Sequence, residues 1–300
     1  MIARLQQAVV LALGLSLAAW LVWAWPRSPA LALGGAALLA LGHALFLAVE
    51  FILLRRVNRT DPAPQASAPQ LLRAWWRETW VALQVFCWRQ PFFSNAVPDC
   101  VASGTFTPGH CGVVLIHGFM CNRGFWTPWL QRLRHSGHPF AAVNLEPVFG
   151  SIDDYARTID EAVAQVSAAA GRPPVLVCHS MGGLVARAWL RTAGADARVA
   201  HVVTIGSPHG GTWLGRFSRA VNGRQMFLGS EWLGALGAAE APARRQGFTC
   251  WYSNCDNIVF PSSTATLPGA DNRFVPGVSH VAMAFHPDVM HSSLAKISAL

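Results

Sequence analysis

The sequence predicts an α/β fold with a mostly parallel central sheet, preceded by an N-terminal transmembrane helical hairpin. Two observations predict this architecture. From Cys111 onward, short runs rich in β-branched residues alternate with helical segments, which is the pattern of a parallel sheet with helices on both faces. Before that region lie two long apolar runs, in a chain that is 52% hydrophobic and only 13% charged. The 300 residues therefore suit one domain of catalytic size plus an apolar appendage.

The first 59 residues are expected to form a two-helix transmembrane anchor. Residues 8–25 carry no charge, and residues 30–54 contain only Glu50. At about 1.5 Å per residue, each run is long enough to cross a hydrocarbon core of about 30 Å. A cleavable signal peptide is the alternative for the first run. That run is longer than the usual signal-peptide core of about 7–15 residues, and a second run follows at once, so the hairpin is favoured.

The arginines next to the hairpin predict its orientation. Arg4 precedes the hairpin and Arg55, Arg56 and Arg59 follow it, whereas only Arg27 lies in the turn. Because cytoplasmic segments carry the excess of positive charge, both ends of the hairpin are expected in the cytoplasm.

One acidic residue interrupts the second apolar run. Glu50 and His43 lie seven residues apart on one face of the expected helix, which allows a polar relay within the membrane. The preferred interpretation is that Glu50, close to Arg55, reaches toward the membrane interface.

The region that follows the hairpin contains a linker and an amphipathic helix. Residues 60–70 are rich in proline, alanine and small polar residues and are expected to be a linker. Residues 71–110 are expected to form an amphipathic helix and a lead-in segment. Apolar residues recur at helical spacing in this helix, namely Leu72, Trp76, Trp80 and Leu83. This helix either lies on the bilayer surface or packs its apolar stripe into the globular domain. The sequence favours neither.

Charge and cysteine content restrict the partners. The formal net charge of +8 comes from scattered arginines without a zinc, RRM or helix-turn-helix pattern, so anionic lipid is a better expected partner than nucleic acid. The seven cysteines lack zinc-type pairing, so no metal site is expected. Cys250 and Cys255 could pair in an oxidising compartment, but the predicted cytoplasmic location argues against a disulfide.

The alternating region, residues 111–300, is the expected catalytic domain. Residues 213–248 lack a clear strand and are either a cap over the site or an ordinary crossing helix with a loop. The runs expected to be strands are 112–118, 139–145, 173–179, 199–207 and 248–254, with a last strand after Asp271, and the clearest helices are 153–171 and 181–194.

Ser180 stands where the strand ending at residue 179 turns into a helix. A nucleophile at such a turn is lifted clear of the sheet, with the positive end of a helix beneath it. Gly182 and Gly183 would let the turn close without a side-chain collision. The pattern is G-x-S-x-G with Cys178 in its first position. A helix N-cap serine is the alternative interpretation.

Acyl transfer through a serine also needs oxyanion donors, a histidine and a carboxylate. The motif "LIHGF" ends an early strand, so the amide of Phe119 is expected to face the substrate oxygen together with the amide of Met181. His117, in the same motif, is expected to bond within its own loop.

The acid and the base are expected late in the chain. Asp256 follows a late strand, whereas the rival Asp271 would lie at the far end of the last strand; the alternative for either is a turn aspartate. His280 follows that last strand and is the expected base. His286 and His291 fall in the expected closing helix.

The motifs "LIHGF", "CHSMGG", "GSPHGGT", "CDNIVFP" and "GVSH" together resemble the α/β-hydrolase superfamily, and within it the bacterial lipase and esterase branch related to triacylglycerol lipases. The resemblance covers residues 111–300. It implies hydrolysis of carboxylic esters without a cofactor or a metal, with Ser180, His280 and Asp256 as the triad and with Phe119 and Met181 at the oxyanion hole.

Combined with the anchor, this resemblance implies a lipid or acyl-ester substrate and a multi-pass protein of a bacterial inner membrane, with its catalytic domain in the cytoplasm. Thioesterase, acyltransferase and amidase activities use the same triad and remain alternatives. A noncatalytic, membrane-tethered hydrolase-like protein is the alternative outside the enzyme class.

Overall fold

The computed structural model describes residues 1–102, 104–193 and 195–300. Ser103, in the expected lead-in segment, and Gly194, the last residue of the helix expected at 181–194, lie outside the described residues.

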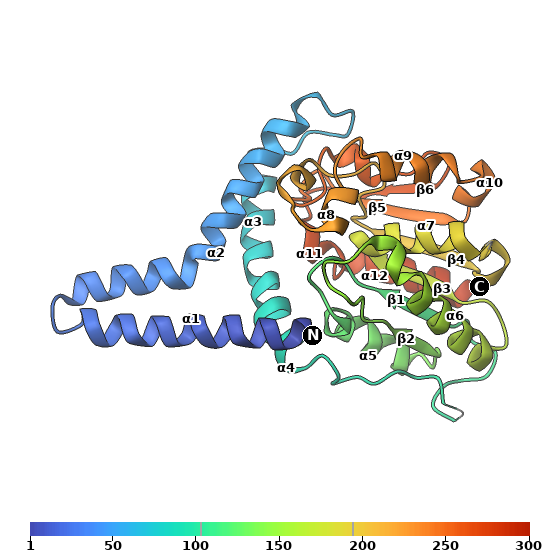
Figure 1. Cartoon of the computed structure of the whole chain (residues 1–300), viewed down its shortest axis with the longest axis horizontal. Helices are drawn as coiled ribbons and strands as arrows, with labels where there is room; N and C mark the ends of the chain where they lie inside the picture. The colour runs from blue at the N-terminus through green and yellow to red at the C-terminus, as the bar shows by residue number, and fades with distance from the viewer. Residues whose placement is uncertain (103, 194) are drawn as a thin grey trace.

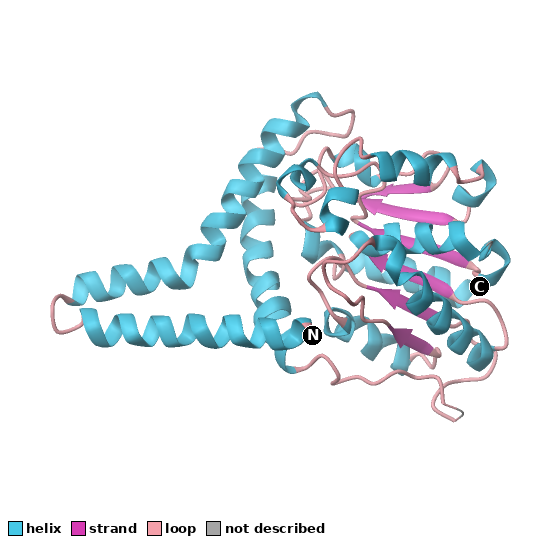
Figure 2. Ribbon diagram, in the orientation of Figure 1, coloured by secondary structure: helices cyan, strands magenta, loops and turns pink. Residues whose placement is uncertain are grey.

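A six-stranded sheet forms the centre of the domain (Figure 2). Every neighbouring pair of strands is parallel, which confirms the fold class predicted from the sequence. The expected strands are all present, in the spatial order β2-β1-β3-β4-β5-β6. Their bounds are β1 (Val113–Ile116), β2 (Phe140–Ala142), β3 (Val175–His179), β4 (His201–Ile205), β5 (Phe248–Tyr252) and β6 (Asp271–Phe274).

Helices cover both faces of the sheet. Val113 and Leu115 of β1 pack into the cluster that includes α5 and α12, whereas Val114 and Ile116 pack into the cluster on the opposite face, with α6 and α7. Because successive strand residues face opposite ways and both faces are covered, the strands are continuously apolar. The helices are α5 (Thr127–His135), α6 (Ala156–Ala170), α7 (Met181–Ala193) and α12 (Pro287–Ala299), with the short helices η3 (Arg123–Trp126), η4 (Ile152–Tyr155), η5 (Ala195–Arg198), η7 (Ser262–Ala265) and α11 (His280–Met283) between elements.

Two long N-terminal helices, α1 (Ile2–Ala24) and α2 (Pro29–Val57), form a hairpin that projects away from the domain (Figure 1). Ser28 caps α2 through its side chain, and Pro29 occupies the first helical position, where its missing N–H costs no hydrogen bond. By length and composition both helices could cross a membrane.

The base of the hairpin packs against the catalytic domain. Phe51 and Leu54 of α2 share a buried cluster with Cys255 and Phe260, in the loop after β5. Glu50 is buried there and accepts a hydrogen bond from Asn257 Nδ2 (2.7 Å). The expectation that Glu50 reaches toward the membrane interface is therefore wrong, because α2 turns this side chain into the domain.

Helix α3 (Ala68–Ala82) begins inside the segment expected to be a linker, after the short turn η1 (Asn58–Thr60). Its start is fixed by a capping box: Ser67 and Gln70 each accept a hydrogen bond from the other's backbone N–H, which satisfies two donors that the helix cannot satisfy itself. The helix continues through a π-helical stretch, η2 (Leu83–Arg89), to α4 (Gln90–Phe92).

The aromatic stripe of α3 faces outward. Leu72, Trp76 and Trp80 are 63%, 57% and 51% exposed, so the interpretation in which this stripe packs into the domain is wrong. The opposite face, with Ala74 and Glu78, is buried instead.

Residues 213–248 form four short helices, η6 (Trp213–Phe217), α8 (Val221–Gln225), α9 (Glu231–Ala238) and α10 (Pro242–Arg245). Met226, Leu233 and Leu236 pack into the same cluster as α6 and α7. All seven cysteines are free, so Cys250 and Cys255 form no disulfide.

Candidate active site

Ser180 occupies the turn between β3 and α7 in a strained conformation. Its φ of 55° lies in the left-handed region that residues with a side chain rarely adopt. A methyl group at Gly182 would lie 2.3 Å from the carbonyl oxygen of Ile116, and one at Gly183 would lie 2.3 Å from Ser207 Oγ. Only glycine at both positions lets the first turn of α7 pack this closely behind Ser180.

The loop after β1 lies directly against the Ser180 side chain. A methyl group at Gly118 would lie 2.8 Å from Ser180 Cβ and 3.3 Å from Ser180 Oγ. This contact brings the backbone that leads to Phe119 beside the serine, while Met181 follows the serine directly. Within the described residues, neither the Phe119 nor the Met181 amide donates to another protein group. Both amides remain available to an outside acceptor.

Both ring nitrogens of His117 form hydrogen bonds with nearby backbone groups. Nδ1 donates to the carbonyl oxygen of Gly118 (2.9 Å), and Nε2 accepts from the amide of Leu145 (3.2 Å). Burial lowers the pKa of His117 to about 4, so the ring is neutral. The Nδ1 bond lies within the loop of His117, as expected, and the Nε2 bond joins this loop to the one after β2.

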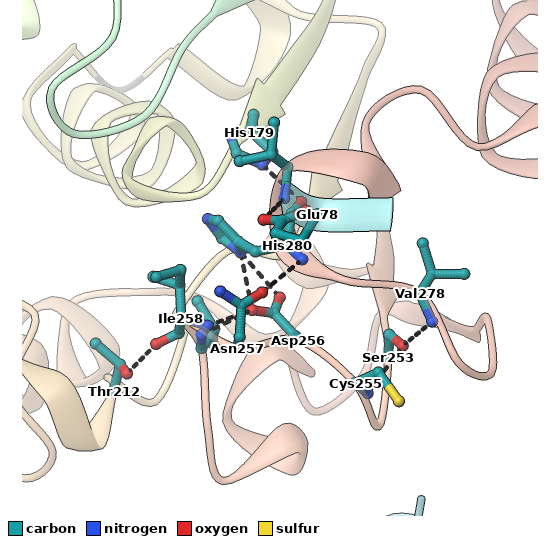
Figure 3. Close-up of polar contacts among 12 residues, drawn as sticks. Glu78, His179, Thr212, Ser253, Cys255, Asp256, Asn257, Ile258, Val278 and His280 are labelled. Carbon is teal, nitrogen blue, oxygen red and sulfur yellow. Dashed lines mark hydrogen bonds and ion pairs between the residues drawn. The ribbon is translucent and has the colours of Figure 1, made fainter. Parts of the chain in front are cut away.

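His280 and Asp256 are in direct contact (Figure 3). His280 Nδ1 lies 2.9 and 3.0 Å from the two carboxylate oxygens of Asp256, and both side chains are buried. Asp256 Oδ1 also accepts from the amides of Ile258 and Val259. Since an ionised carboxylate only accepts hydrogen bonds, the neutral imidazole carries its proton on Nδ1 and leaves Nε2 free to accept one.

The neighbouring acidic groups together outweigh burial in setting the pKa of His280. Burial by itself would lower this pKa, but the Asp256 charge and hydrogen bond, together with the charges of Glu78 and Glu50, raise it above the ordinary histidine value. A negative partner favours the imidazolium. The site therefore favours a histidine that can take up a proton.

The rival residues lie elsewhere. Asp271 is the first residue of β6, at the opposite edge of the sheet, and pairs with Thr249 and Arg273. His286 precedes α12, and His291 lies within it.

The edge formed by the carboxyl ends of the strands brings the serine, the histidine and the aspartate to one place. Ser180 follows β3, Asp256 follows β5 and His280 follows β6. Between them lies Gly206 after β4, with φ 57°; a methyl group there would lie 2.8 Å from Asp256 Oδ2 and 3.2 Å from His280 Nδ1. The amide of Ser180 donates to Ile205, next to this glycine (2.9 Å).

No hydrogen bond joins Ser180 Oγ to His280 within the described ranges. Such bonds are often long in an empty site and tighten when substrate binds.

A model of the alpha/beta hydrolase family matches residues 113–285, the part of the chain that contains this site. The chain belongs to the α/β-hydrolase family. Two solved structures have the same fold. The mature lipase BlEst2 of Bacillus licheniformis is 16% identical, with a TM-score of 0.58 over 66% of this chain and 96% of the lipase. Lipase B of Aspergillus fumigatus is 17% identical, with a TM-score of 0.54 over 65% of this chain and 55% of that protein. No curated protein matches the sequence.

Three further residues contact His280 or the two residues after it in this α/β-hydrolase, and no role for them was predicted from the sequence. His179 Nε2 lies 3.2 Å from the carbonyl oxygen of His280, with the two rings 4.6 Å apart. Asn257 Oδ1 accepts from the His280 amide (3.3 Å), and Glu78 accepts from the two amides that follow. Asn257 and His179 lie within the motifs "CDNIVFP" and "CHSMGG", which is a weak signal. Nothing in the sequence connects Glu78, on a distant helix, with this hydrolase site.

Within the described residues, no three histidine, cysteine, aspartate or glutamate side chains come together in a group that could hold a metal ion. The groups around Ser180 are those of acid–base and nucleophilic chemistry.

Proposed function

We propose that this α/β-hydrolase is a membrane-anchored serine hydrolase that cleaves carboxylic esters through Ser180, His280 and Asp256. The observation that carries the proposal is the buried His280–Asp256 pair, located at the strand edge that also presents Ser180 at a positive φ. A serine held this way next to a base is the arrangement needed for nucleophilic catalysis.

In the proposed reaction, Ser180 Oγ attacks the ester carbonyl carbon while its proton passes to His280 Nε2. The carbonyl π electrons move onto oxygen, and the resulting oxyanion accepts hydrogen bonds from the Phe119 and Met181 amides. Collapse of this intermediate breaks the bond to the alkoxy group, which leaves as an alcohol with the proton from His280. Water then attacks the acyl-enzyme with His280 again as base, and the acid is released with Ser180 restored.

Asp256 has two functions in this proposal. Its hydrogen bond to Nδ1–H holds the tautomer in which Nε2 faces the reaction, and its charge stabilises the imidazolium formed during attack. The backbone amides of Ile258 and Val259 fix the orientation of the carboxylate itself.

The proposed substrate is a lipid or acyl ester. Two apolar helices long enough to span a membrane and the exposed Trp76 and Trp80 on α3 support a location of the domain at the bilayer surface. Indole rings are favoured at the depth of lipid headgroups. A panel of lipid esters, acyl thioesters and acyl amides assayed on the purified protein would identify the leaving group.

The test of the nucleophile is Ser180→Ala. This variant should fold normally, fail to hydrolyse p-nitrophenyl esters and lose labelling by a fluorophosphonate probe. Ser167→Ala, on α6 and away from the site, is the matched control and should retain both. Wild-type turnover by Ser180→Ala would refute the assignment.

A further inference from the structure

Two buried carboxylates from the N-terminal helices contact the loops that carry His280 and Asp256. Glu78, on α3, is 1% exposed. Its Oε1 accepts from the amide of Val281 (2.9 Å), and its Oε2 accepts from the amide of Ala282 (3.1 Å). These amides belong to the first turn of α11, which begins at His280. The carboxylate therefore satisfies donors that the helix leaves free at its start.

The second carboxylate, Glu50 on α2, acts through Asn257. Asn257 Nδ2 donates to Glu50 Oε2 (2.7 Å), and Asn257 Oδ1 accepts from the backbone amide of His280 (3.3 Å). One asparagine, adjacent in sequence to Asp256, thus connects the hairpin helix with the main chain of His280. Figure 3 shows its bond to His280. Replacing Glu50 by alanine would leave the buried Asn257 amide donor without its acceptor, which is costly for a buried polar group.

Polar contacts at the end of α2 hold the same loop. Asn58 Nδ2 donates to Ser262 Oγ (2.8 Å) and Asn58 Oδ1 accepts from the Ser262 amide (3.2 Å), while Asp61 Oδ2 accepts from the Ser263 amide (3.0 Å). Together with the apolar contacts of Phe51 and Leu54, these bonds fix the position of the anchor relative to the loop that begins with Asp256.

We infer that Glu50 and Glu78 are positioning residues for His280, so that the hairpin and α3 support the catalytic histidine as well as tethering the domain. This inference rests on the proposed function. Glu78 fixes the chain after His280, and Glu50 with Asn257 fixes its amide. Two anchoring points on either side of one residue leave its side chain little freedom to move away from Ser180. A catalytic group displaced by about 1 Å can lose about 100-fold in rate.

The groups that face the His280 imidazole are Asp256 after β5, Glu78 on α3, Glu50 on α2 and the ring of His179 at the end of β3. His179 is buried and its pKa lies well below the ordinary value, so it brings no positive charge. Burial raises the pKa of Glu78, while the Val281 and Ala282 amides and the charge of His280 oppose this shift. Over the pH range in which Glu78 is ionised, removing its charge destabilises the imidazolium and should move the acidic limb of kcat/KM to lower pH. A purely structural role would not move this limb.

The experiment compares full-length wild type, Glu50→Ala and Glu78→Gln in detergent micelles. Glu50→Ala removes the acceptor of Asn257 Nδ2, and Glu78→Gln keeps the shape of the side chain but only one of its two acceptor oxygens. Each should lose about 10- to 100-fold in kcat with KM little changed, when turnover is expressed per site labelled by a fluorophosphonate. Glu161→Gln, an exposed glutamate paired with Arg157 on α6, is the matched control and should behave as wild type.

Wild-type kcat per labelled site and an unmoved acidic limb in both folded variants would overturn the inference. If Glu78→Gln does not fold, Glu50→Ala decides the kcat test alone. A wild type that hydrolyses no ester would instead refute the proposed function. The inference is then tested by NMR titration of the His280 ring, assigned with His280→Ala: Glu78→Gln should lower its pKa, and an unchanged titration would refute the positioning role.

Discussion

Ser180 and Gly206 show how backbone conformation shapes the site at the scale of single residues. Both have positive φ values, 55° and 57°. The glycines directly after Ser180, and Gly206 itself, lie so close to neighbouring groups that a side chain would not fit. The glycines after Ser180 marked the turn in the sequence. The role of Gly206, whose missing side chain leaves space for Asp256 and His280, became apparent only when β4 and β6 were placed.

Gly182→Ala should destabilise the fold. The added methyl would meet the Ile116 carbonyl oxygen at 2.3 Å, a backbone atom that can move only with β1, so we expect a loss of about 1–3 kcal/mol. Gly234→Ala is the control, because a methyl there has no neighbour within 4 Å and alanine favours the helix by up to about 1 kcal/mol. Urea unfolding of both variants measures the difference. Equal stabilities would contradict the packing argument.

The pH dependence of hydrolysis should follow His280. Its pKa lies above the ordinary 6.5, and only the neutral ring can accept the Ser180 proton. Activity should therefore be lost as pH falls through this raised pKa, with an acidic limb of kcat/KM above 6.5.

Asp256→Asn should move the acidic limb to lower pH and reduce kcat by roughly 10⁴-fold, because the amide no longer enforces the productive tautomer. Asp271→Asn, at the opposite sheet edge, is the control. An acidic limb at the wild-type pH in Asp256→Asn would contradict the assignment of Asp256 as the partner of His280.

At the scale of elements, a buried ion pair joins α7 to the segment between α9 and α10. Arg187 donates from Nε and Nη2 to the two carboxylate oxygens of Glu240 (2.6 and 2.9 Å), with side chains 3% and 1% exposed. Arg187 Nη1 also donates to the carbonyl oxygen of His209 (3.0 Å). The pair therefore fixes residues 213–248 to the helix that begins directly after the proposed nucleophile.

Glu240→Ala should cost about 3–5 kcal/mol, because it leaves a buried guanidinium without its partner. Replacing both residues by apolar ones, Arg187→Met with Glu240→Leu, should recover much of this loss. Thermal unfolding measures both variants. Glu161→Ala, in an exposed pair screened by solvent, is the control and should leave Tm unchanged. A small effect of Glu240→Ala would show that the pair contributes little to holding the segment.

At the scale of the whole molecule, the hairpin, α3 and the catalytic domain form one connected structure. The hairpin projects on one side of the domain (Figure 1), and its base contacts the loop after β5. Most of the apolar helix α1 is exposed. Exposing a large apolar surface to water is unfavourable, whereas the same surface is stable in the hydrocarbon core of a bilayer.

Both ends of the hairpin are expected on the same side of the membrane. The protein should stay in the membrane pellet at alkaline pH. A reporter fused at the C-terminus should respond as a cytoplasmic one, and a reporter inserted in the turn between α1 and α2 should respond as an external one. Release into the supernatant, or an external C-terminal reporter, would contradict this topology.

The sequence by itself determined the α/β fold, the two apolar helices and the position of Ser180 at a strand-to-helix turn. These features depend on local patterns: apolar periodicity, charge-free length and glycines beside a serine. Tertiary structure alone decided that Glu50 and Glu78 reach the chain around His280 and that α3 exposes its tryptophans. Each of these features depends on which distant segments pack together. The spacing of residues along the chain does not determine the orientation in which two helices pack.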